Sequence, residues 1–129
     1  MSYPDDVRYT RDHEWARQEN GLVTVGITNY ATDQLGDIVF VELPEPGRRV
    51  EAGKAFGVVE AVKTVSDLFA PVAGEVVEVN GGLGDNPALV NQDPYGEGWM
   101  IRIRPVDAAA FARLLTAGDY EKHVEEQHA

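Results

Sequence analysis

The sequence contains no cysteine among its 129 residues. This excludes disulfide bonds, thiolate metal ligands and a cysteine nucleophile, and it fits a reducing compartment. No apolar run approaches the roughly 20 residues that a membrane-spanning helix requires. The first six residues, Met-Ser-Tyr-Pro-Asp-Asp, have neither the apolar core of a secretion signal nor the Arg-rich character of an organelle leader. We therefore expect a cytoplasmic protein.

Basic residues are also scarce. The chain has 11 Lys and Arg residues against 22 Asp and Glu residues, which gives a formal net charge of −11. Such a field repels nucleic-acid phosphates and anionic membrane surfaces, so we expect neither as a partner. An acidic surface favours solubility, and it also leaves open a protein partner with a basic docking face.

Strand patterns dominate what is present. Asn20-Gly21 is a strong two-residue hairpin signal, and it should pair the segment around Trp15 with residues 22–27. Further apolar or alternating runs, each bounded by turn residues, predict strands at 38–43, 55–61, 65–69, 75–79 and 99–104. Short strands at this spacing indicate a mainly β fold, a flattened barrel or sandwich of two antiparallel sheets. We expect a single domain over residues 1–129, with its core at about 9–105.

Helical signals are confined to short peripheral pieces and to the C-terminal segment, at about residues 107–126. The predicted helices are residues 28–35, a single turn at 88–91, residues 108–115 capped by Asp107, and a last helix that starts at Asp119. The final helix would place Tyr120 and Val124 on the β core, and residues 125–129 should be frayed. The glycines at 81, 82 and 84 predict a loop.

Lys63 lies where two β-type apolar runs meet, so it should sit at the tip of a hairpin. An amine on a tight turn is poorly placed for a core and well placed for modification by another enzyme. The flanking residues, Glu-Ala-Val-Lys at 60–63, Ser66-Asp67 and Ala-Pro-Val-Ala-Gly-Glu at 70–75, closely resemble the modified hairpin of lipoyl-carrier proteins. Motifs at residues 9–15, 25–28 and 89–100 extend the resemblance, specifically to the H proteins of the glycine cleavage system, over about residues 9–120.

The resemblance implies a lipoyl/biotinyl-carrier hybrid fold and lipoic acid joined by an amide to Lys63. It further implies a shuttle that is not itself an enzyme and that works in a bacterial cytoplasm, with a mature mitochondrial protein as the alternative. The shuttle would receive the aminomethyl group of glycine from a pyridoxal-phosphate glycine decarboxylase and pass it to an aminomethyltransferase. Dihydrolipoamide dehydrogenase would reoxidise the dithiol, and a lipoate ligase or lipoyl transferase would attach the cofactor.

Two acidic residues match positions that the H-protein family uses to shelter the loaded arm. The aminomethyl group is a protonated amine, and a carboxylate within hydrogen-bond reach would hold it. By this resemblance Glu14 and Asp67 line the cleft, with Asp12 nearby. The alternative for each is a solvent-facing acid with no such role.

Several other interpretations remain open or are excluded. The runner-up is a lipoyl domain of a 2-oxoacid dehydrogenase complex, although the chain lacks the usual Asp-Lys-Ala tip and the Ala/Pro linker. A relay that donates lipoate to other apoproteins also remains possible from sequence, whereas a biotin carrier would prefer Met on both sides of the lysine. Ala61 and Val65 depart from the residues usual beside the lysine, which puts ligase recognition and the fit of the docked arm in question.

The three histidines, His13, His123 and His128, lack the spacing of a metal site, so we expect no metal. Gly53-Lys54 lacks the first glycine and the Ser/Thr of a phosphate loop. Trp15 and Trp99 should pack in the core or in a hairpin.

Overall fold

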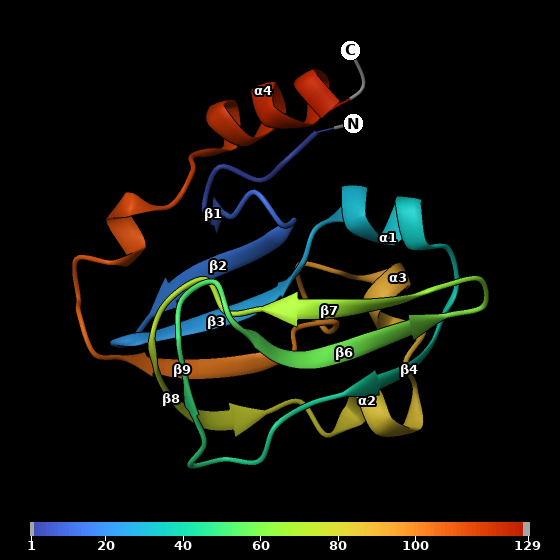
Figure 1. The fold of residues 1–129 in the computed structure, drawn as a ribbon, viewed down its shortest axis with the longest axis horizontal. Helices are drawn as coiled ribbons and strands as arrows, with labels where there is room; N and C mark the ends of the chain where they lie inside the picture. The colour runs from blue at the N-terminus through green and yellow to red at the C-terminus, as the bar shows by residue number, and fades with distance from the viewer. Residues whose placement is uncertain (1, 128–129) are drawn as a thin grey trace.

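The computed structural model describes residues 2–127, and Figure 1 shows their path. The described chain is mainly β, with short helices at the periphery and one longer C-terminal helix. The strands are β1 (Arg8–Tyr9), β2 (Glu14–Glu19), β3 (Leu22–Ile27), β4 (Ile38–Glu42), β5 (Arg49–Val50), β6 (Ala55–Ala61), β7 (Val65–Phe69), β8 (Gly74–Val79) and β9 (Ile101–Pro105). The helices are α1 (Asn29–Leu35), α2 (Gly82–Asp85), α3 (Leu89–Gln92), the 3-10 turn η1 (Phe111–Arg113) and α4 (Ala117–Gln127).

The strands form two antiparallel sheets. One has six strands in the order β1-β2-β3-β9-β8-β5, and the other has three in the order β4-β6-β7. The two sheets lie against each other and do not close into a barrel within residues 2–127 (Figure 1). The predicted mainly β fold of two antiparallel sheets is therefore confirmed, in its sandwich form. Between residues 2 and 127, no helix combines the length and apolar character needed to cross a membrane.

The core lies between the sheets, where the inward faces of the strands meet. Val23, Val25 and Ile27 all face it from β3, as their alternation predicts, and Val59 and Leu68 face it from the smaller sheet. A second cluster joins β1, β2, α1 and α4 around Trp15 and the stacked rings of Tyr9 and Tyr120, whose centroids are 4.5 Å apart. This second cluster attaches α4 to the body of the protein. It also confirms the predicted packing role of Trp15.

Local signals in the sequence account for several element boundaries. Asn20 and Gly21 both adopt positive φ, 51° and 78°, as the predicted two-residue turn requires. The side chain of Thr28 accepts a hydrogen bond from Ala31 N–H and caps α1, which ends at Gly36 with φ 81°. The bounds of β6 and β7 agree with the prediction.

The predicted helix over residues 108–115 is wrong. Asp107 does cap this segment, since its Oδ1 accepts the N–H of Ala109, but only the short turn η1 forms. Leu114 is already extended (φ −75°, ψ 163°), and the next residue, Leu115, exchanges two backbone hydrogen bonds of 2.9 Å with Tyr9. Pairing with β1 thus overrides the local helical preference.

Other boundaries differ in smaller ways. Helix α4 begins two residues before Asp119, and residues 125–127 are helical rather than frayed. The glycine-rich segment predicted as a loop forms α2 because Leu83 is anchored in the core. The apolar run at residues 38–41 favours a buried strand, yet Val39 and Phe40 of β4 are 53% and 49% exposed.

The close approach of β3 to Trp15 gives a test of the packing. A Cβ atom on Gly26 would lie 2.7 Å from three atoms of the buried Trp15 ring, so Gly26→Ala must displace the indole. We expect this overpacking to lower the free energy of unfolding by about 1–3 kcal/mol, measured by urea denaturation. Gly118→Ala is the control, because Gly118 lies in α4 with open space around it and should gain up to about 1 kcal/mol. Equal stability of the two variants would contradict the predicted contact.

Candidate functional site

Lys63 lies in the turn that joins β6 to β7, at the outer end of a hairpin that projects from one end of the molecule (Figure 1). The turn is closed by a hydrogen bond of 2.8 Å from Ala61 N–H to the carbonyl of Thr64. A second hydrogen bond, from Val62 N–H to the carbonyl of Asp37, ties the turn to the chain that enters β4. Lys63 is exposed, so the structure places it where the sequence predicted and leaves its amine accessible.

Two hollows lead away from Lys63 along α1. The first has a volume of about 400 Å3 and is lined by Lys63 and Val62 of the hairpin and by residues 33–37. The second, of about 430 Å3, lies next to it, because Gln34 and Leu35 line both. Its other lining residues are Asp12, His13, Tyr30, Ala31, Ser66 and Gln127. Together the two hollows form a groove, here called the α1 groove, that runs from the hairpin tip to the start of β2.

Glu14 lies directly after His13 at the start of β2 and is buried, with 1% of its surface exposed. Its Oε1 accepts a hydrogen bond of 2.7 Å from the Thr10 hydroxyl, and its Oε2 accepts one of 3.3 Å from the N–H of Phe69. Burial raises the pKa of Glu14 to about 8, against the opposing effect of these two donors. The alternative of a solvent-facing acid is thus wrong for Glu14.

Asp67 is exposed on the middle of β7, two residues from the amide that binds Glu14. Its neighbour Ser66 lines the α1 groove, as does Asp12 near the other end of the same hollow. The structure therefore brings Asp12 and Glu14 to the region where β7 lies beside the start of β2, whereas the side chain of Asp67 lies on the opposite face of β7 from that of Ser66. It does not place the carboxylate of Asp67 in the same buried setting as that of Glu14.

Tyr120 is a residue whose role the sequence did not indicate. Its hydroxyl lies 2.7 Å from His13 Nδ1 and 2.8 Å from Thr28 Oγ1, so it joins α4, the β1–β2 connection and the N-terminus of α1. Each of these three elements contributes residues to the α1 groove. Only the apolar spacing of Tyr120 with Val124 was visible in the sequence, and it predicted burial rather than this hydrogen-bonded junction.

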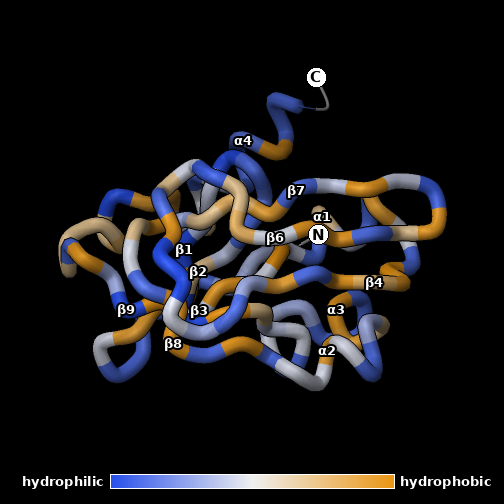
Figure 2. The backbone as a smooth tube through the Cα atoms, turned by 60° about the horizontal axis from the view of Figure 1, so that its bottom comes forward, coloured by the Kyte–Doolittle hydropathy of each residue, from blue (hydrophilic) through white to orange (hydrophobic). Residues whose placement is uncertain are grey.

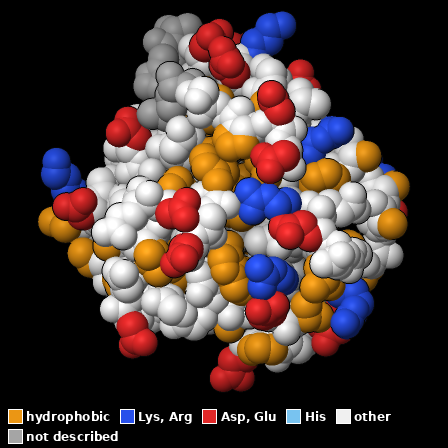
Figure 3. Space-filling view, turned by 180° about the vertical axis from the view of Figure 1, so that it is seen from behind, with side chains coloured by type: hydrophobic (Ala, Val, Ile, Leu, Met, Phe, Trp, Pro, Cys, Tyr) orange, Lys and Arg blue, Asp and Glu red, His pale blue; other side chains and the backbone are white. Residues whose placement is uncertain are grey.

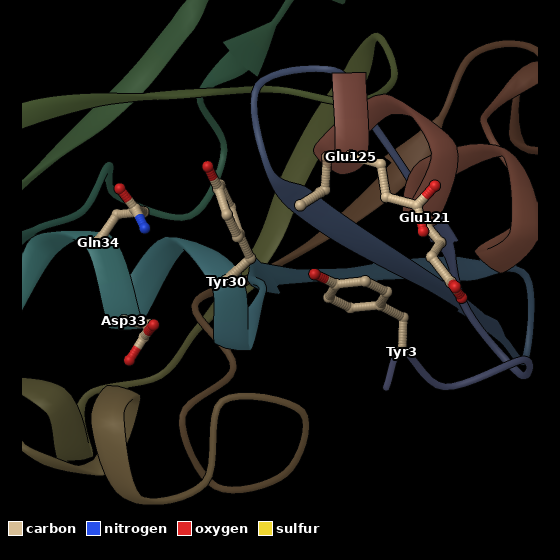
Figure 4. Close-up of a pocket in the computed structure, with 7 residues that line it drawn as sticks. Tyr3, Tyr30, Asp33, Gln34, Glu121 and Glu125 are labelled. Atoms are coloured by element: carbon tan, nitrogen blue, oxygen red, sulfur yellow. The ribbon is translucent and has the colours of Figure 1, made fainter. Parts of the chain in front are cut away.

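A third hollow, of about 360 Å3, lies between α1 and α4 and is shown in Figure 4. Asp33 and Gln34 enter it from α1, and Glu121 and Glu125 enter from α4, with two tyrosine rings between them. Since Gln34 also lines the α1 groove, the two spaces adjoin. Figure 3 shows the face of the molecule that is turned away from the viewer in Figure 1. Acidic side chains are scattered over this face as well, in keeping with the net charge of −11.

The two histidines that the structure describes have other partners. His13 binds Tyr120, and His123 Nε2 lies 2.9 Å from the carbonyl of Arg11, while His128 lies outside the described residues. Burial, with His123 as a second cause, lowers the pKa of His13. In residues 2–127 no group of three or more His, Asp or Glu side chains is placed to hold a metal ion.

Known proteins similar to this chain match it over nearly its whole length. The family model described as "Glycine cleavage H-protein" matches residues 7–127. The glycine cleavage system H protein of Thermus thermophilus is 58% identical over 127 residues, which cover 98% of this chain and 99% of the relative. The corresponding protein of Bacteroides fragilis is 57% identical over 121 residues, covering 94% and 96%.

The same relationship holds in three dimensions. The crystal structure of a glycine cleavage system H protein from Mycobacterium marinum matches with a TM-score of 0.86 and 44% identity, covering 98% of this chain and all of that one. The similarity thus extends over the projecting hairpin, the α1 groove and the C-terminal helix together. This chain belongs to the glycine cleavage H-protein family.

Proposed function

We propose that Lys63 carries lipoic acid as an amide, and that the α1 groove holds the loaded arm between visits to the partner enzymes. H proteins are the lipoyl-carrying shuttles of the glycine cleavage system and are not themselves catalysts. The observation that supports the assignment within this chain is the position of Lys63, exposed at the tip of a projecting hairpin and lining the first hollow of the groove.

The residues of the groove fit a lipoyl arm in shape and chemistry. Val62, Leu35 and Ala31 supply apolar surface along its length, which suits the methylene chain of the cofactor. The second hollow is lined by Asp12 and His13, which come directly before the buried Glu14 in the chain. When bound, the cofactor would supply a disulfide, one sulfur of which bonds the aminomethyl carbon while the other becomes a thiol, and the protein would supply position and shelter.

Glu14 and Asp67 are proposed to hold the ammonium of the loaded arm. Glu14 is fixed on β2 by a hydrogen-bond donor on each oxygen, and it directly follows Asp12 and His13, which line the groove. A cation beside a buried carboxyl group favours its ionised form, and the bound ammonium would therefore lower the pKa of Glu14 from about 8. Asp12, which lines the groove, would add negative charge there, and Asp67 would add its charge from the outer face of β7.

The expected partners follow from this cycle. The other components of the glycine cleavage system would meet the arm's sulfur atoms: the glycine decarboxylase, the aminomethyltransferase and dihydrolipoamide dehydrogenase. A lipoate ligase or lipoyl transferase would meet Lys63 itself. The similar proteins reported above are bacterial, which supports the bacterial, cytoplasmic setting expected from the sequence.

The attachment site can be tested by mass. Incubation of the purified protein with lipoate ligase, lipoate and ATP should add one lipoyl increment, which peptide mapping places on Lys63. Lys63→Arg should take up none, because a guanidinium stays protonated and does not acylate. Lys54→Arg is the matched control and should be modified like the wild type. A lipoyl group on Lys54 or Lys122 would overturn the assignment.

The role of Glu14 can be tested by the lifetime of the aminomethyl-loaded protein. Glu14→Gln keeps the size of the side chain but removes the charge that holds the ammonium, so the loaded form should decay about tenfold faster. The decay is followed by intact mass after removal of free glycine and the decarboxylase. Glu19→Gln changes an exposed acid on the same strand and should leave the lifetime unchanged. An unchanged lifetime in Glu14→Gln would remove Glu14 from the proposed site.

Glu14 should also leave a signature in the pH dependence of stability. Its pKa is raised from an ordinary value of 4.5 to about 8, so between these values the folded protein binds more protons than the unfolded chain. This group therefore makes the free energy of unfolding fall as pH rises from 5 to 8, by at most about 1.4 kcal/mol per pH unit. The free energy of unfolding is measured by urea denaturation across this pH range for the wild type and for Glu14→Gln. Because both proteins keep His13, the difference between their curves reports the titration of Glu14 alone. Parallel curves for the two proteins would show that Glu14 titrates normally.

A further inference from the structure

Exposed large apolar side chains gather at the hairpin end of the molecule. Five such side chains are exposed in the described chain: Val39, Phe40, Val62, Val65 and Val106. The first four belong to the start of β4 and to the β6–β7 hairpin, and we call them the tip patch. In Figure 2 apolar stretches of both segments reach the same end of the molecule. The two segments are distant in the sequence, because Val62 follows Phe40 by 22 positions, so the fold brings them together.

Strand register places part of the tip patch on one face. Phe40 lies directly opposite Glu60, and Glu60 lies opposite Val65, so the three side chains form a row across β4, β6 and β7. The neighbouring row, Val41, Val59 and Ser66, points the other way, and its two valines are buried in the core. The row that contains Phe40 and Val65 therefore covers the outer face of the three-stranded sheet.

The remaining two members adjoin this row. The register of β4 against β6 shifts between Ile38 and Phe40, and this irregularity leaves Val39 outside the ladder and turned to solvent. Val62 lies in the hairpin turn, and its N–H donates to the carbonyl of Asp37 just before β4. Both segments are thus fixed next to Lys63 by backbone hydrogen bonds.

Acidic side chains surround the apolar ones on this face. Glu60 lies between Phe40 and Val65. The next row on the same outer face, two positions further along the strands, carries Glu42 and Asp67 on either side of Val58. A partner that covers this face must offer apolar contacts and must neutralise these carboxylates with Lys or Arg. The face therefore fits a partner surface that combines an apolar centre with a basic rim.

We propose that the tip patch is the docking surface for the enzyme that acylates Lys63, an inference that rests on the proposed function. In that reaction the Lys63 ammonium first gives a proton to a base. Its nitrogen then forms an amide bond to the carbonyl carbon of an activated lipoyl ester, the bond to the activating group breaks, and a second proton leaves the nitrogen. The enzyme must thus bring its acyl carbon into bonding contact with Nζ, which brings the enzyme's surface against the residues around Lys63. Partners that act on the loaded arm meet its far end instead and do not need this contact.

The test uses the apo protein and lipoate ligase, with initial rates of lipoylation measured by intact mass over a range of acceptor concentrations. Phe40→Ser should lower kcat/KM for the acceptor about tenfold, mainly through a higher KM, because it removes the largest apolar contact while Nζ is untouched. Val39→Ser should lower it in the same direction. Val106→Ser is the matched control, since Val106 is at least as exposed as Phe40 and Val39 but follows β9 at the end of the molecule opposite the hairpin (Figure 1).

The possible outcomes separate the two proposals. If wild type takes up no lipoyl group on Lys63, the proposed function fails. If wild type is lipoylated and Phe40→Ser is as good an acceptor as Val106→Ser, the docking inference fails and the proposed function stands. After exhaustive lipoylation, Phe40→Ser should support glycine–bicarbonate exchange by the decarboxylase with an unchanged KM. A KM that rises there, with normal ligase kinetics, would assign the patch to the decarboxylase and overturn the inference. Thermal unfolding of each variant confirms that the exposed substitutions leave the fold intact.

Discussion

The antiparallel pairing of β6 with β7 is the interaction on which the function of this protein depends. Its register runs from Ala55 opposite Phe69 to Glu60 opposite Val65, and the hydrogen bond between Ala61 and Thr64 closes the turn beyond it. The pairing fixes Lys63 at the tip and Leu68 in the core at the same time. It also positions the Phe69 N–H that binds Glu14, so the hairpin connects the proposed attachment point with the proposed ammonium site.

Each polar side chain that is buried beside this hairpin has a hydrogen-bond partner. Among the described residues, no buried side-chain nitrogen or oxygen lacks one. Glu14 is held by Thr10 and Phe69, and Tyr120 is held between His13 and Thr28. Tyr120 thereby fixes His13, which lines the α1 groove, and such preorganisation lowers the cost of docking a flexible arm. The C-terminal helix therefore contributes to the groove even though it lies far from Lys63 along the chain.

The sequence predicted the hairpin well and the rest of the site less well, for physical reasons. Residues 55–69 carry a strong strand pattern around a turn, and this local information suffices to place Lys63. The burial of Glu14 depends on Phe69, 55 positions away, and no pattern near Glu14 records that contact. The helix predicted at residues 108–115 failed for the same reason, because Leu115 pairs with Tyr9, more than 100 positions earlier. Two-residue strands such as β1 and β5 are too short to leave a periodic signal.

The exposed start of β4 is another case in which strand pairing overrides what the local sequence pattern predicts. An apolar run of Ile-Val-Phe-Val predicts a buried strand, yet β4 is an edge strand whose register shift turns Val39 and Phe40 outward. Exposed apolar residues on a sheet edge favour edge-to-edge association, and natural proteins reduce this risk with charges and bulges. Both devices are present here, in Glu42 and Glu60 and in the register shift itself. Such protection makes the apolar surface tolerable in the free protein, but it gives no reason to expose that surface. A partner that covers it next to the lysine supplies the reason.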